Sequence, residues 1–186
     1  MKLKSIIVLV MLMGLLFSGC TRYYVPVVYP LKDGMAPAFS GDNNIMLINE
    51  NPPGELFSSL GNLGPYQWYG DLKRWTDTAT SLIRIELEQR GFEINDRNPK
   101  VLKLSIQRAT VHQRNFQVRA IVYLTVETGD GYIHEYVGDN ASGWSLYRAC
   151  SGAVSRAVGV MLSDKKIITY VTAKPCPEIS YITTNK

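Results

Sequence analysis

The chain has 186 residues and carries 20 lysines and arginines against 16 aspartates and glutamates, a formal net charge of +4. Two of the basic residues, Lys2 and Lys4, lie at the N-terminus, and charges of both signs alternate along the rest of the chain. This balance excludes a strongly basic nucleic-acid-binding protein, so we expect no nucleic-acid partner. The length predicts one folded domain with a single core.

The first 19 residues have the pattern of an export signal. Lys2 and Lys4 precede an apolar run over residues 6–17, and small residues follow it. The run is too short to be a permanent membrane span, which needs about 20 apolar residues. We therefore expect residues 1–19 to be a signal peptide that is removed from the mature protein.

The residues at the end of this signal, Phe17-Ser18-Gly19-Cys20, resemble the lipobox of bacterial lipoproteins. The resemblance implies that the Cys20 thiol is acylated, with palmitate as a typical acyl chain, and that Cys20 becomes the first mature residue. Thr21 follows it, and in that family a residue other than Asp at this position favours the outer membrane. We expect a lipid-anchored envelope protein that faces the periplasm.

Residues 20–53 are predicted to be the lipidated cysteine followed by a proline-rich tether, because proline disfavours regular helices. The apolar stretch 23–29 within it can lie against the membrane, against a partner or, as we favour, against its own domain. Residues 44–49 contain four consecutive apolar side chains, which predict a short buried strand before Pro52-Pro53-Gly54.

Periodicity predicts two helices. The first covers Asp71 to Arg90, with apolar side chains at spacings of three and four, Asp71 as N-cap and Gly91 after its end. The second covers about Ser145 to Leu162 and has small side chains on its apolar face.

Period-two alternation predicts strands over 101–107 and 117–127, and a turn at Gly129-Asp130-Gly131 leads into a strand over 132–137. These strands would form an antiparallel meander, and residues 166–171 a final edge strand. The fold class is therefore α+β: a two-layer sandwich with two helices on one face of a mainly antiparallel sheet of four to five strands. We expect this domain to cover residues 54–173, with a tail over 174–186.

The sequence contains no pattern typical of catalysis, a cofactor or a metal site. Its two histidines, His112 and His134, have no cysteine or carboxylate at a metal-ligand spacing. Ser163 to Lys166 matches SxxK, but it lies at a helix end and lacks companion motifs. We therefore predict a protein that is not an enzyme and that binds neither cofactor nor metal.

Two sets of residues are candidates for function. Tyr66, Trp68 and Tyr69 lie in a loop with glycine and proline, where aromatic side chains can contact a partner or ligand. Cys150 and Cys176 can form a disulfide in an oxidising compartment, or Cys150 can be a reduced core residue. Both readings of the cysteines stay open.

With the lipobox, the helix ending Glu88-Gln89-Arg90-Gly91-Phe92 and the strand Val101-Leu102-Lys103-Leu104, the chain resembles the YajG-type family of bacterial lipoproteins. The resemblance implies a small α+β module and transfers no functional residues. Our leading hypothesis is a non-enzymatic lipoprotein that binds or assembles another envelope protein. The alternative is a carrier of an envelope lipid or glycan in a cavity between sheet and helices, rimmed by Tyr66, Trp68 and Tyr69.

Overall fold

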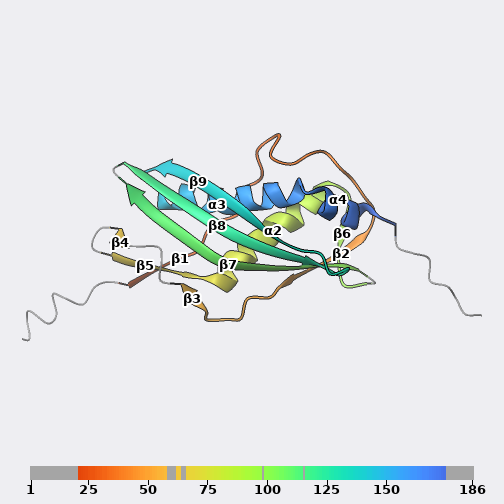
Figure 1. Cartoon of the computed structure of the whole chain (residues 1–186), viewed down its shortest axis with the longest axis horizontal. Coiled ribbons are helices and arrows are strands. Elements are labelled where there is room, and N and C mark those ends of the chain that lie inside the picture. The colour runs from red at the N-terminus through yellow and green to blue at the C-terminus, as the bar shows by residue number, and fades with distance from the viewer. Residues whose placement is uncertain (1–20, 58–61, 64–65, 98, 115, 175–186) are drawn as a thin grey trace, which may run out of the picture.

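The computed structural model describes residues 21–57, 62–63, 66–97, 99–114 and 116–174 (Figure 1). Its elements, in chain order, are β1 Thr21–Tyr24, β2 Asn44–Asn49, β3 Leu56–Phe57, β4 Asn62–Leu63, β5 Tyr66–Asp71, α2 Leu72–Gln89, β6 Glu93–Ile94, β7 Lys100–Arg114, β8 Gln117–Thr128, β9 Ile133–Gly143, α3 Leu146–Leu162 and α4 Lys165–Thr172.

The main sheet has five strands in the order β6-β2-β7-β8-β9. Strands β7, β8 and β9 form the predicted antiparallel meander, and β2 runs parallel to both of its neighbours. Helices α2 and α3 lie on one face of this sheet, behind the strands in Figure 1. The predicted α+β fold, with one layer of sheet and one layer of helices, is confirmed.

The core lies between these two layers because each element has one apolar face. Every second residue of β8 from Val118 to Thr128 is buried, as period-two alternation requires. The helices contribute Trp75, Leu82, Ile83, Met161 and Leu162, each without exposed surface. These side chains fill the space between sheet and helices.

The ends of α2 are where the sequence predicts them. The Asp71 side chain accepts a hydrogen bond from the backbone N–H of Arg74 at 3.1 Å, which is N-cap geometry. Gly91 follows the helix with φ +90°, a conformation that glycine adopts without steric cost.

The predicted edge strand over 166–171 is wrong, because these residues form helix α4. Asp164 caps it by accepting from the backbone N–H of Lys166 at 2.8 Å. Ile167 and Val171, four residues apart, are both fully buried on one face. The β-branched composition suggested a strand, but the cap and the burial of one helical face outweigh that preference.

The segment predicted to be a tether is part of the folded unit. Residues 24–43, which we call the strap, run along the side of the helices that faces away from the sheet (Figure 1). The strap leads into β2, which lies inside the main sheet between β6 and β7. The folded unit therefore includes residues 21–53, which were predicted to lie outside the domain.

The backbone polar groups of the strap are paired with side chains from both helices. On the α3 side, Val27 N–H donates to Ser151 Oγ at 3.1 Å and Ser155 Oγ donates to the Tyr29 carbonyl at 3.1 Å. On the α2 side, Thr78 Oγ1 donates to the Pro26 carbonyl at 3.0 Å. Proline and the lack of periodicity exclude a helix here. These hydrogen bonds pair backbone N–H and C=O groups of the strap, as a helix or sheet would do.

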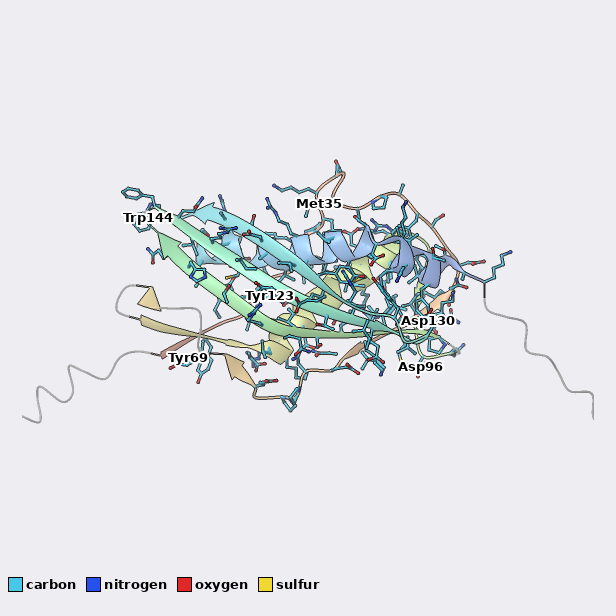
Figure 2. The ribbon with its side chains drawn as sticks, viewed as in Figure 1. Met35, Tyr69, Asp96, Tyr123, Asp130 and Trp144 are labelled. Atoms are coloured by element: carbon cyan, nitrogen blue, oxygen red, sulfur yellow. The ribbon has the colours of Figure 1, made fainter. Side chains whose placement is uncertain are left out.

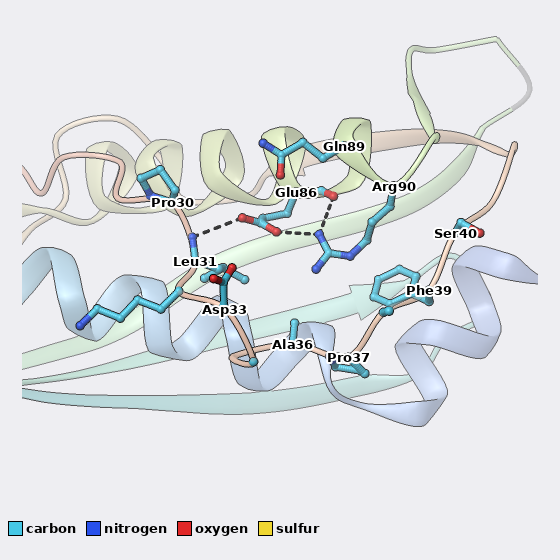
Figure 3. Close-up of a pocket in the computed structure, with 13 residues that line it drawn as sticks. Pro30, Leu31, Asp33, Ala36, Pro37, Phe39, Ser40, Glu86, Gln89 and Arg90 are labelled. Atoms are coloured by element: carbon cyan, nitrogen blue, oxygen red, sulfur yellow. Dashed lines mark hydrogen bonds and ion pairs between the residues drawn. The ribbon is translucent and has the colours of Figure 1, made fainter.

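Figure 3 shows how the strap is fixed near the end of α2. The backbone N–H of Leu31 donates to Glu86 Oε1 at 3.3 Å, and Arg90 Nη1 lies 2.6 Å from the other carboxylate oxygen. Both charged side chains are largely buried, and a buried charge without an ionic partner is unfavourable, so the ion pair stabilises both of them.

A four-residue spacing of small side chains on α3 makes room for the strap. Ser151, Ser155, Gly159 and Ser163 follow one another at every fourth position, which places them on one side of the helix. A Cβ atom on Gly159 would lie 3.1 Å from the Met35 carbonyl oxygen of the strap. Small side chains here allow the two backbones to approach closely.

Candidate functional site

Exposed aromatic rings gather where the β7–β8 turn meets the end of β9. Phe116 is 72% exposed and Trp144 is 63% exposed, and their ring centroids lie 5.2 Å apart in an edge arrangement. Figure 2 places Trp144 at the extreme end of the long axis of the molecule. Two large rings that pack on each other in solvent are an unusual feature for a monomeric surface.

The backbone at Trp144 is strained. Its φ of +57° is the only positive value among the described non-glycine residues, and a conformation of this kind costs roughly 1–3 kcal/mol. The Trp144 N–H donates to the Phe116 carbonyl at 3.3 Å, and the next residue, Ser145, caps α3 by accepting from Arg148 N–H at 3.2 Å. The ring is thus held outward by a fixed backbone, as at many functional positions.

The predicted aromatic candidates lie on a second, smaller sheet at the same end of the molecule (Figure 1). In this sheet β5 pairs with β1 in parallel and with β3 and β4 antiparallel. Tyr69 is half-buried, and its ring lies 6.2 Å from that of Tyr23, which is 63% exposed. The side chains of Tyr66 and Trp68 lie outside the described part of the structure.

We call Phe116 and Trp144 together the aromatic end. Sequence reasoning missed both residues, although a signal was available: each is an aromatic residue at the end of a strand, where polar turn formers are usual. The Tyr23–Tyr69 pair belongs to the smaller sheet, and Figure 2 shows Tyr69 apart from Trp144.

Strand β1 lies at the same end of the long axis as the aromatic end (Figure 1). Thr21 is the first residue of β1 and aligns with Gln67 of β5. Cys20, the predicted site of acylation, precedes Thr21 in the sequence and lies outside the described residues.

Cys150 is a buried free thiol on the inner face of α3. Burial raises the pKa of this thiol above its ordinary value, so the nucleophilic thiolate is disfavoured. Cys176 lies outside the described residues, and the disulfide with Cys150 stays a prediction.

The histidines have separate environments. His134 stands in β9 between Tyr132 and Tyr136, with ring centroids 6.0 and 4.8 Å away, and His112 is exposed on β7. The hydroxyls of Tyr132 and Tyr136 both donate to Asp164, at 2.8 and 2.6 Å. Among the described residues, no three histidine, cysteine or carboxylate side chains gather as a metal site would require.

The cavity expected between sheet and helices stays a prediction, because the side chains of Tyr66 and Trp68 at its rim lie outside the described structure; where the described helices face the sheet, the core is closely packed. Trp75, Ile106, Leu124 and Met161 have no exposed surface there. Two of the hollows in the described structure lie instead along the strap, one of them shown in Figure 3 between residues 30–40 and the end of α2. Of the described helices, none is long and apolar enough to cross a membrane.

No family model and no curated protein matches the chain. Among solved structures, the chain is similar to a crystal structure of a Xanthomonas campestris protein described as DUF330, with 14% sequence identity and a TM-score of 0.45. The match covers 81% of this chain and 95% of that chain. The function is therefore argued from the residues of this chain.

Proposed function

We propose that this protein is an outer-membrane-anchored periplasmic lipoprotein without catalytic activity that binds another envelope protein through its aromatic end. The observation that carries the proposal is the Phe116–Trp144 pair, held in solvent by a strained backbone. Membership of the YajG-type lipoprotein family is part of the same proposal and rests on the lipobox and the order of elements.

The composition around the pair supports a protein partner. Tryptophan and other aromatic residues dominate the binding energy of protein interfaces when a polar rim surrounds them. Exposed Gln117 adjoins Phe116, and Ser142 and Gly143 precede Trp144. The nearby Arg119 is already paired with Asp139.

The position of the chain end supports a partner in or on the same membrane. Acylation of Cys20 would hold Thr21 close to the bilayer surface, and Figure 1 places β1 at the same end of the long axis as the aromatic end. A strap packed on the helices leaves no long tether to carry the domain away from the membrane. The partner is therefore expected to present its binding surface close to the lipid headgroups.

A photo-crosslinking residue at position 144 tests the binding surface in intact cells. We expect one protein adduct of defined mass, and no such adduct from the same residue at position 160, where Val160 is 50% exposed on α3. Adducts with lipid alone, or identical adducts from both positions, would contradict a protein partner at the aromatic end. Phe116→Ala and Trp144→Ala should each reduce recovery of the partner at least tenfold, since an interface hot spot contributes about 2 kcal/mol or more.

A Cys20→Ser variant tests the anchor separately. We expect it to move from the membrane fraction to the soluble periplasmic fraction, because the acylated thiol is lost. If the variant still fractionates with membranes, the lipid anchor is wrong, whatever the crosslinks show.

A further inference from the structure

A second surface of the molecule has the chemistry of a ligand site. A pocket of about 790 Å³ lies between strap residues 29–35, β9 residues 140–142 and α3 residues 148–156. Ligand pockets in proteins commonly have volumes of about 300–1,000 Å³. Figure 2 labels Met35 on the strap where it passes along α3, at the border of this pocket.

The charge of the pocket has one sign. Lys32, Arg148 and Arg156 line it, and none of the other described lining residues is acidic. Within the described residues, no carboxylate forms an ion pair with any of these three cations. Three cations around a hollow without an acidic lining residue attract an anion.

The acidic residue next to the pocket, Asp139, forms its ion pair with an arginine outside the pocket. Arg156 Nη1 donates to the backbone carbonyl of Asp139 at 2.7 Å, which orients the guanidinium. The Asp139 carboxylate accepts from Arg119 Nε at 2.8 Å; this hydrogen bond lowers the pKa of Asp139, and the charge of Arg156 adds a smaller contribution in the same direction. The remaining guanidinium N–H groups of Arg156 are available to a ligand, in the forked geometry that suits phosphate oxygens.

The rest of the pocket is partly apolar. Tyr29, Pro30 and Met35 of the strap also line it. The Tyr29 ring packs edge-on against that of Tyr147 at 5.7 Å, which supports this wall. An anion with an apolar portion would satisfy both halves of the pocket, whereas a small inorganic anion would use the cations alone.

We infer that this pocket binds the phosphate headgroup of an amphiphile, with Arg148 and Arg156 on the phosphate and the ligand's apolar portion against Tyr29 and Met35. The site adjoins the aromatic end through Ser142 but uses other side chains, and it does not depend on the protein partner proposed above. It differs from the cavity between sheet and helices that the sequence suggested.

Calorimetric titration of the mature chain, residues 20–186 with Cys20→Ser, tests this site with short-chain phosphatidic acid below its micelle concentration. We expect it to bind at least tenfold more tightly than inorganic phosphate or the matched phosphatidylcholine. The double variant Arg148→Gln, Arg156→Gln should weaken binding at least tenfold. Arg84→Gln, an exposed arginine that faces Glu88 on α2, is the matched control and should bind as the unsubstituted protein does.

Three results would overturn the inference: no binding of phosphatidic acid, equally tight binding of inorganic phosphate, or unchanged binding by the double variant. The urea midpoint of each variant checks folding. Arg148→Gln alone provides a second test, since no hydrogen bond from its side chain is among those of the described structure. Its titration should show weaker binding with an unchanged midpoint.

Discussion

The indole N–H of Trp75 donates to the backbone carbonyl of Tyr24 at 3.0 Å, joining α2 to the start of the strap. Trp75 is fully buried, so removing its donor leaves the carbonyl without that partner. We expect Trp75→Phe to lower the free energy of unfolding by about 1–3 kcal/mol, measured by urea denaturation. Trp144→Phe, at a position 63% exposed, is the matched control and should change it by less than about 0.5 kcal/mol. Equal effects would mean that the strap is not fixed by this bond.

Two glycines of β9 should differ sharply when replaced by alanine. A Cβ on Gly138 would lie 1.9 Å from the Ala153 carbonyl oxygen and 2.5 Å from the Ala157 nitrogen, both backbone atoms of α3. Gly138→Ala should therefore force the helix from the sheet and cost about 3 kcal/mol or more. A Cβ on Gly143 would meet its nearest atom at 3.9 Å, so Gly143→Ala should be nearly neutral. Thermal unfolding measures the midpoint of each variant. Equal midpoints would contradict the close packing of α3 on β9.

Asp164 should contribute to the acid sensitivity of the fold. Burial opposes ionisation, but hydrogen bonds from Tyr136 and Tyr132 outweigh it, and the pKa of Asp164 lies below its usual value. A carboxyl with a lowered folded pKa stabilises the protein above its unfolded pKa of about 3.9 and loses this contribution as pH falls through the folded value.

Asp164→Asn keeps an N-cap side chain for α4 and removes the charge. We expect the variant to be less stable at pH 7 and to lose less stability than the unsubstituted protein as the pH falls from 5 to 2. Urea unfolding over this pH range measures the difference. Parallel pH profiles would show that Asp164 contributes nothing through its ionisation.

Cys150 should be unreactive while the protein is folded. Its thiol is fully buried and its pKa is raised by burial, so both access and thiolate formation are suppressed. In a Cys20→Ser, Cys176→Ser variant, we expect maleimide to label Cys150 at least a hundredfold more slowly in buffer than in denaturing urea. Fast labelling in buffer would contradict the buried position.

Mass spectrometry of the non-reduced chain with both Cys150 and Cys176 present tests the predicted disulfide directly.

The two long helices and the meander could be predicted because each carries its burial pattern in consecutive residues. In β8 the alternation from Val118 to Thr128 is uninterrupted, and in α2 the cap Asp71 and the terminal Gly91 mark both ends. Helix α4 was missed because its eight residues include many β-branched side chains, and a segment this short with that composition is compatible with a strand or a helix. Its type depends on Asp164 as a cap and on burial of Ile167 and Val171.

By itself, the sequence determined the amphipathic elements, the α+β class and the expectation that Cys20 carries the anchor, since each is encoded in residues close together along the chain. The tertiary structure alone decided that residues 24–43 form a strap and that Phe116 meets Trp144. Both depend on contacts between residues that lie far apart in the sequence. The strap has no period of its own, and its backbone groups find partners such as Ser151 and Trp75 only after the helices have packed side by side. The structure thereby makes residues 24–43 part of the folded domain, where the sequence predicted a proline-rich tether.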